Sequence, residues 1–146
     1  MEKKVAIVTG GSKGIGAAIV KQLVTDGFAV AIGERDLASA NQYAQQFPAG
    51  TVKAYAADVS DRAAVFALVK QTVADFGRLD VMVNNAGISM EKSLLEMSEE
   101  EMDRLYAVNE KGVLWGIQAA AQQFIAQQTP GKIINASSIG GYKVQP

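Results

Sequence analysis

The stretch Val5-Ala6-Ile7-Val8-Thr9-Gly10-Gly11-Ser12-Lys13-Gly14-Ile15-Gly16 decides the fold of this 146-residue chain. Its first four residues form an apolar run, which is typical of a strand buried on both faces of a parallel sheet. Glycines follow the run directly. From Gly14 onward, Ile15, Ile19 and Leu23 recur at four-residue spacing, as apolar residues do on one face of a helix. The stretch therefore predicts a strand, a glycine turn and a helix in immediate succession.

Short β-rich runs alternate with helical stretches along the rest of the chain. We predict strands over residues 5–8, 28–32, 51–57, 79–83 and 132–135, and helices over 14–26, 37–47, 61–76 and 98–128. Crossovers between parallel strands are right-handed and place their helices against the sheet, so both faces are covered. The sequence therefore predicts a doubly wound, Rossmann-like α/β fold with five strands and four helices.

Composition excludes several kinds of chemistry. The chain contains neither cysteine nor histidine, which excludes disulfides, thiolate nucleophiles, Ser-His-Asp hydrolysis and zinc sites built on those ligands. We expect no metal site. The formal net charge of -1 gives no electrostatic reason to expect a nucleic-acid partner. No apolar run approaches the ~20 residues that cross a bilayer, so we expect no membrane partner and a cytoplasmic location.

The glycine turn has the properties of a pyrophosphate site. A helix start offers unpaired N–H groups and a positive dipole end, and glycines let phosphates approach the backbone. The spacing is Gly-x-x-x-Gly-x-Gly, and the residues after Gly16 do not match a P-loop. We predict a dinucleotide site formed by Gly10, Ser12, Lys13, Gly14, Ile15 and Gly16. A purely structural glycine turn is the alternative.

Glu34 follows the second predicted strand, roughly twenty residues after the glycines. A carboxylate at this place can accept hydrogen bonds from the adenosine ribose and repel a 2′-phosphate, which favours NAD. The neighbouring cations Lys13 and Arg35 can attract that phosphate, so NADP stays possible. A solvated surface charge is the alternative interpretation of Glu34.

Polar and small residues also end the third and fourth predicted strands. Asp58-Val59 follows the third strand, where Asp58 can meet the adenine amino group. Helix capping is the alternative for Asp58, although Ser60 is closer to the capping position. Asn84-Asn85-Ala86-Gly87 ends the fourth strand, and its small residues let a cofactor lie close. We assign Asn85, Ala86 and Gly87 to the cofactor site, with a purely structural turn as the alternative.

Two residues are candidates for the chemical step. Asn109 shares a helical stripe with Leu105 and Val113, which predicts that its amide lies on the buried face. A buried amide needs hydrogen bonds, so Asn109 is either satisfied by neighbouring backbone or organises a water or a catalytic group. Ser138 lies just beyond the fifth strand, in register with the other strand ends. Its hydroxyl can donate to a substrate carbonyl.

Together, the glycine pattern, the Asn-Asn-Ala-Gly turn, Asn109 and Ser138 resemble the short-chain dehydrogenase/reductase family in order and spacing. More narrowly, residues 26–32, 112–120 and 131–136 are similar to the bacterial diacetyl/acetoin reductases, also called 2,3-butanediol dehydrogenases. The resemblance implies reversible hydride transfer between a nicotinamide and a small carbonyl/alcohol pair. It casts Ser138 as the donor that polarises the carbonyl and Asn109 as part of a water and proton relay. It also implies a homo-oligomer, a tetramer packed through the long helix.

The sequence departs from the family at its acid/base pair. The family's Tyr-x-x-x-Lys falls just beyond Pro146, and no tyrosine here (Tyr43, Tyr55, Tyr106 or Tyr142) has a lysine four positions later. The family's last helix and final strands are also missing, which predicts a sheet incomplete on its C-terminal side. We therefore expect residues 1–146 to be the dinucleotide-binding, N-terminal domain of a longer enzyme, with little turnover alone. The alternatives are a non-catalytic binding module and a reductase of sugars, steroids or acyl thioesters.

Overall fold

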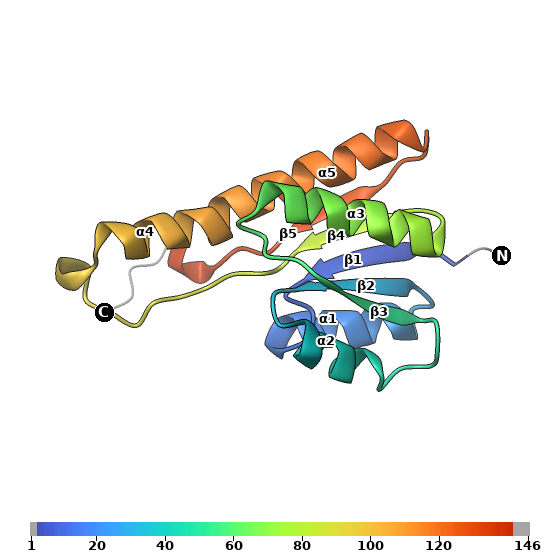
Figure 1. The fold of residues 1–146 in the computed structure, drawn as a ribbon, viewed down its shortest axis with the longest axis horizontal. Helices are drawn as coiled ribbons and strands as arrows, with labels where there is room; N and C mark the ends of the chain where they lie inside the picture. The colour runs from blue at the N-terminus through green and yellow to red at the C-terminus, as the bar shows by residue number, and fades with distance from the viewer. Residues whose placement is uncertain (1–2, 142–146) are drawn as a thin grey trace.

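A five-stranded parallel sheet with strand order β3-β2-β1-β4-β5 organises the molecule (Figure 1). The strands are β1 (Val5–Thr9), β2 (Ala29–Glu34), β3 (Val52–Ala56), β4 (Val81–Asn84) and β5 (Lys132–Asn135). The computed structural model describes residues 3–141, so Tyr142 lies outside the described residues. The direction of strand addition reverses between β1 and β4, and the carboxyl ends of strands at such a reversal are where α/β folds bind ligands. The predicted Rossmann-like fold is confirmed.

Helices cover both faces of this sheet. Figure 1 shows α1 and α2 on one face and α3 and α5 on the other. The helical elements are α1 (Gly14–Thr25), α2 (Leu37–Ala44), α3 (Arg62–Phe76), η1 (Leu94–Glu96), α4 (Glu99–Tyr106), η2 (Ala107–Lys111), α5 (Gly112–Ala126) and η3 (Ile139–Gly141). Within residues 3–141, every helix is too short or too polar to cross a membrane.

The central strand β1 is buried on both faces, which explains why its residues are apolar without alternation. All five of its residues are buried. Ile7 packs into the core beneath α3 and α5, whereas Ala6 and Val8 pack into the core beneath α1 and α2. A strand covered on both faces needs apolar side chains at every position. The central strand is thereby fixed between two cores, and the glycine turn begins at its carboxyl end.

The long helix predicted over residues 98–128 is interrupted. The predicted capping box at Ser98 is present: its Oγ accepts from the Glu101 N–H at 3.3 Å, and its own N–H donates to Glu101 Oε2 at 2.8 Å. After α4, however, the turn η2 is π-helical and leads into α5. A π turn adds a residue, so side chains beyond it no longer follow the 3.6-residue period. Asn109 lies in η2 and is exposed, so the prediction that it faces the buried side was wrong.

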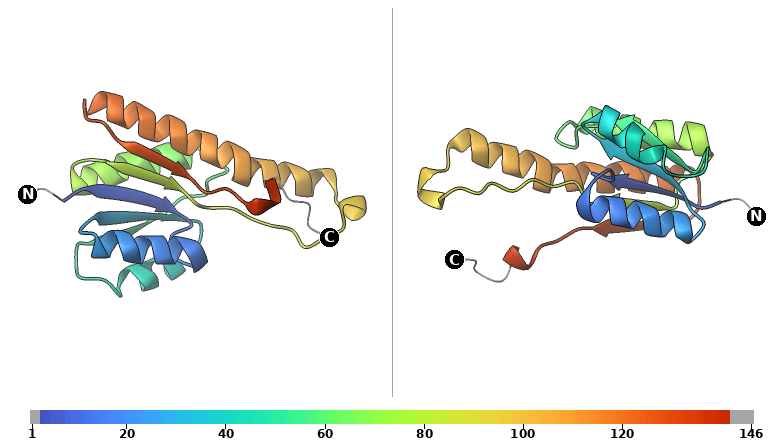
Figure 2. Two further views of the ribbon diagram at one scale, coloured as in Figure 1. Left: turned by 180° about the vertical axis from the view of Figure 1, so that it is seen from behind. Right: turned by 90° about the horizontal axis from the view of Figure 1, so that it is seen from below.

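Strand β5 is covered less than the other strands. It stands at the end of the strand order, and Ile134 keeps 51% of its surface exposed. In Figure 2, β5 follows the edge of the sheet while α4 projects beyond the strand ends. Asn135, the last residue of β5, pairs in register with Asn84 of β4. The described sheet therefore has a covered centre and one poorly covered edge.

Candidate functional site

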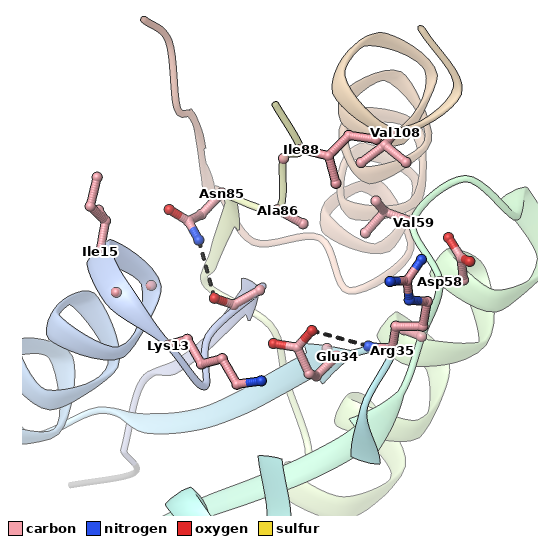
Figure 3. Close-up of a pocket in the computed structure, with 16 residues that line it drawn as sticks. Lys13, Ile15, Glu34, Arg35, Asp58, Val59, Asn85, Ala86, Ile88 and Val108 are labelled. Atoms are coloured by element: carbon pink, nitrogen blue, oxygen red, sulfur yellow. Dashed lines mark hydrogen bonds between the residues drawn. The ribbon is translucent and has the colours of Figure 1, made fainter. Parts of the chain in front are cut away.

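The carboxyl ends of β1, β2 and β4 and the segment after β3 surround a cavity of about 390 Å³ (Figure 3). Cavities of this size are typical of small-molecule sites. Every residue that we predicted for the cofactor lines the cavity except Ser12, namely Gly10, Lys13, Gly14, Ile15, Gly16, Glu34, Arg35, Asp58, Val59, Asn85, Ala86 and Gly87. The strand-end positions in the sequence therefore converge on one site.

The glycine turn leaves the start of α1 open. Gly10 and Gly14 have φ angles of 64° and 51°, in the left-handed region that favours glycine. A Cβ at Gly16 would lie 2.1 Å from the Gly10 carbonyl oxygen, so only glycine lets the helix begin this close to the loop. A Cβ at Gly14 would meet no atom within 4 Å. Lys13, the N-cap residue, provides no side-chain cap, so the first turn of α1 can receive an anion.

Thr9 joins the glycine turn to the turn after β4. Its Oγ1 accepts hydrogen bonds from the N–H groups of Asn85 and Ala86, both at 3.0 Å. The Asn85 side chain donates in return to the carbonyl oxygens of Thr9, at 3.0 Å, and Gly10, at 3.3 Å. Sequence reasoning missed Thr9, although a threonine that ends an apolar strand before glycines is a visible signal. Also missed were the cavity-lining residues Gly33, Ala57, Ile88 and Val108.

Glu34 is held in place from both sides of its carboxylate. Ser12 Oγ donates to Glu34 Oε2 at 2.8 Å, and the Arg35 N–H donates to Glu34 Oε1 at 3.2 Å. Ser12 thus contacts a cavity-lining side chain without lining the cavity itself. Glu34 is half-buried, which distinguishes it from a freely solvated surface charge.

The two cations near Glu34 each face another carboxylate. Lys13 Nζ lies 4.0 Å from Asp36 Oδ2, in an exposed ion pair. Arg35 lies beside Asp58 in Figure 3. Hydrogen bonds from Ser60 lower the pKa of Asp58 from its ordinary value, and the charges of Arg35 and Arg104 lower it further. The positive charge of Lys13 and Arg35 is therefore shared with acidic neighbours.

Asp58 does not cap the following helix. Its Oδ1 accepts from the N–H and the hydroxyl of Ser60, at 2.9 and 2.7 Å. The N-cap of α3 is Asp61, which accepts from the Ala63 N–H at 2.9 Å. The helix start predicted at residue 61 was one residue too early, and Ser60 is nearer the cap than Asp58 but is not the capping residue. The Asp58 carboxylate remains at the cavity wall.

Asn109 contacts the cavity wall through the backbone of Ile88. Its Oδ1 accepts from the Ile88 N–H at 2.8 Å, and its Nδ2 donates to the Ile88 carbonyl oxygen at 2.8 Å. Both ends of the amide are therefore satisfied by backbone. Ile88 lines the cavity, as does Val108, the residue before Asn109. The π turn η2 is thereby tied to the segment that follows β4.

Ser138 lies outside the cavity lining. It is exposed, and its Oγ accepts from the Gly140 N–H at 3.1 Å. The preceding strand, β5, is linked at its last residue to β4, because Asn84 Nδ2 donates to Asn135 Oδ1 at 2.8 Å. The structure thus gathers the predicted cofactor residues but brings neither Ser138 nor Asn109 into the cavity. In residues 3–141 no three acidic side chains cluster in a way that could hold a metal ion.

Comparisons with known proteins find relatives that match almost the whole chain. The family model described as short chain dehydrogenase matches residues 4–146. A diacetyl reductase [(S)-acetoin forming] of Staphylococcus aureus is 47% identical over 98% of this chain and 56% of that protein. An L-2,3-butanediol dehydrogenase of Corynebacterium glutamicum is 40% identical over 98% of this chain and 57% of that protein.

A solved structure is similar over almost the whole chain. The 3-ketoacyl-(acyl-carrier-protein) reductase of Brucella melitensis, complexed with NADH, matches with a TM-score of 0.92 and 34% identity. The match covers 99% of this chain and 61% of that one. The chain therefore spans a little over half the length of the curated relatives that it matches.

Proposed function

Because this chain belongs to the short-chain dehydrogenase family, we propose that its cavity binds a nicotinamide dinucleotide and that the whole protein is an oxidoreductase. The observation that carries this proposal is the open start of α1 beside Glu34, on one wall of a single cavity. The glycine turn provides N–H groups for a pyrophosphate, and Glu34 provides an acceptor for ribose hydroxyls. Asp58 and Val59 lie where the adenine would bind. We propose that residues 1–146 form this dinucleotide-binding domain.

The acidic surroundings of Lys13 and Arg35 favour NAD over NADP. A 2′-phosphate would meet the Glu34 carboxylate, while the cations that could attract it already face Asp36 and Asp58. The NADH complex of the similar reductase supports the same cofactor. When bound, the nicotinamide supplies the hydride-transfer chemistry. The chain's own residues bind and orient it, with Asn85, Ala86 and Gly87 lining the cavity next to the glycine turn.

A titration of the chain with NADH and NADPH, followed by fluorescence or calorimetry, tests the cofactor site. We expect NADH to bind more tightly than NADPH. Absence of binding by either dinucleotide would contradict the proposed site, whereas tighter binding of NADPH would contradict only the choice of NAD. Gly141→Ala is a suitable control, because a Cβ there meets no atom within 4 Å and the position is outside the cavity.

For the whole protein we propose diacetyl or acetoin as the substrate, reduced to acetoin or 2,3-butanediol. The likeness to the named diacetyl reductase and butanediol dehydrogenase supports this substrate class. Ser138 would polarise the carbonyl, and Asn109 would act in the water and proton relay. The complete gene product, assayed with NADH and diacetyl, should oxidise NADH. Reaction with sugars, steroids or acyl thioesters but not diacetyl would favour a different short-chain reductase.

A second function for the 146-residue chain itself is a non-catalytic binding module, because its sequence carries no Tyr-x-x-x-Lys pair. We expect dinucleotide binding but little turnover from this chain alone, and rapid turnover would contradict that expectation. A cytoplasmic location and a homotetramer also remain proposals. Exposed apolar side chains on α5, Leu114 and Ile125, support association, which light scattering of the whole protein can test.

A further inference from the structure

We propose that Ser12 is a positioning residue that sets the preference for NAD by holding Glu34 in place. This inference rests on the proposed dinucleotide site. Ser12 is unusual among the residues predicted for that site, because it does not line the cavity. Its hydroxyl instead donates to Glu34 Oε2 at 2.8 Å. The two residues come from different elements, the turn before α1 and the end of β2, so the bond connects two walls of the cavity.

A glutamate rejects a 2′-phosphate only if its carboxylate stays where the phosphate would bind. The free side chain has several rotatable bonds, and an unattached carboxylate can rotate into solvent when a like charge approaches. Here both carboxylate oxygens accept a hydrogen bond, one from Ser12 and one from the Arg35 N–H. The Arg35 bond comes from the adjacent residue and is long, at 3.2 Å. Ser12 is therefore the attachment that prevents Glu34 from turning away.

Loss of this attachment would expose charges that favour the competing cofactor. Lys13 lies next to Ser12 in sequence and pairs with Asp36 only at 4.0 Å, with both side chains largely exposed. Arg35 follows Glu34. If Glu34 rotates outward, a 2′-phosphate can compete with Asp36 and Asp58 for these two cations, because charge-assisted hydrogen bonds to phosphate are strong. Ser12 thus acts through Glu34, and removing its hydroxyl should improve NADPH binding more than it changes NADH binding.

The test compares dissociation constants for NADH and NADPH in a double-mutant cycle of Ser12→Ala and Glu34→Ala. In the chain with Glu34 intact, Ser12→Ala should lower the preference for NADH by about three- to tenfold, mainly through tighter NADPH binding. In the Glu34→Ala background, Ser12→Ala should leave the ratio of the two constants unchanged. Dependence of one substitution on the other is the signature of a residue that acts through its partner.

Ser60→Ala is the matched control. Ser60 also donates its hydroxyl to a strand-end carboxylate, Asp58 Oδ1, at 2.7 Å. Asp58 is assigned to the adenine, which the two dinucleotides share, so Ser60→Ala should not change the NADH-to-NADPH ratio. Circular dichroism of each variant verifies that the fold is kept.

Three results would overturn the inference, and they are distinguishable. Equal changes in NADH and NADPH affinity on Ser12→Ala would show that Ser12 binds a part common to both. An unchanged effect in the Glu34→Ala background would show that Ser12 acts independently of Glu34. If the unsubstituted chain binds neither dinucleotide, the proposed function itself is wrong and the role of Ser12 fails with it.

Discussion

At the amino-terminal end of β1 and β4, polar side chains bind one another and the backbone, whereas at the carboxyl end they surround a cavity. Asp80, which is 8% exposed, accepts from the Val5 N–H at 2.8 Å and from Arg78 through both carboxylate oxygens. Gln127 donates to the Leu79 carbonyl oxygen at 2.6 Å and accepts from the Leu79 N–H at 3.2 Å. These groups close the sheet at that end.

At the carboxyl end of the same strands, the hydrogen bonds hold turns and side chains around the cavity. Thr9 and Asn85 fix two turns against each other, and Ser12 and Arg35 fix Glu34, yet the space between these pairs stays open. The turn there is formed by glycines, which have no side chain, and the start of α1 has no side-chain cap. From this difference we infer that the amino-terminal end of the sheet contributes mainly to stability. The carboxyl end is less tightly packed and leaves space for a ligand. Substitutions at the two ends should therefore have separable effects.

Asp80→Ala should produce the largest loss of stability, about 3–4 kcal/mol, because it leaves the buried Val5 N–H group without its acceptor and removes the carboxylate that pairs with the partly buried Arg78. NADH affinity measured under folded conditions should not change. Urea unfolding measures the stability, and dinucleotide titration measures the affinity.

The control for this variant is Asp75→Ala. Asp75 pairs with Lys53 at 3.3 Å and accepts from the Tyr55 hydroxyl at 2.6 Å, but it is exposed, so we expect a much smaller loss than for Asp80→Ala. Equal losses for the two variants, or weaker NADH binding by folded Asp80→Ala, would contradict the division of roles between the two ends.

Thr9→Val should affect both stability and binding, because Thr9 belongs to the carboxyl end but is 2% exposed. Valine keeps the shape and removes the acceptor of two N–H groups, which should lower the free energy of unfolding by about 2–3 kcal/mol. The glycine turn and the turn after β4, which these bonds hold together, should loosen, and NADH should bind more weakly. Thr9→Ser, which keeps the oxygen, should retain most of the affinity. A serine variant as defective as the valine variant would assign the effect to packing of the methyl group.

Gly16→Ala should weaken ligand binding more clearly than it lowers stability. The added Cβ would lie 2.1 Å from the Gly10 carbonyl oxygen and 2.7 Å from Asn85 Nδ2, so the glycine turn must shift. We expect a loss of about 1–3 kcal/mol in stability from overpacking, together with at least about tenfold weaker NADH binding. Ala18→Ser, at an exposed position of the same helix, is the control. Unchanged affinity in Gly16→Ala would mean that the turn does not hold the dinucleotide.

Sequence reasoning located the strand ends better than the contacts between them. Strand positions follow from apolar runs, and the carboxyl ends of parallel strands must share one edge, so Glu34, Asp58 and Asn85 could be assigned to one site in advance. The π turn at Asn109 could not, because apolar periodicity assumes an α-helix and does not indicate an added residue. The bond from Ser12 to Glu34 depends on side-chain positions on two elements, which no local pattern records.

The smallest effect on the free energy of unfolding should come from protonating Asp58, which lines the cavity. Hydrogen bonds from Ser60, and then the charges of Arg35 and Arg104, lower the pKa of Asp58 in the folded chain. A lowered folded-state pKa means that Asp58 contributes stability above its unfolded pKa of about 3.9, and that this contribution disappears as the pH falls through the folded value. Asp58→Asn should therefore be less stable than the unsubstituted chain at neutral pH, and the gap should narrow below about pH 4. Urea unfolding of both proteins over that pH range measures the gap. A gap that does not change with pH would show that the charge of Asp58 is not what stabilises this strand end, and the effect of the substitution would then belong to the hydrogen-bond geometry with Ser60 alone.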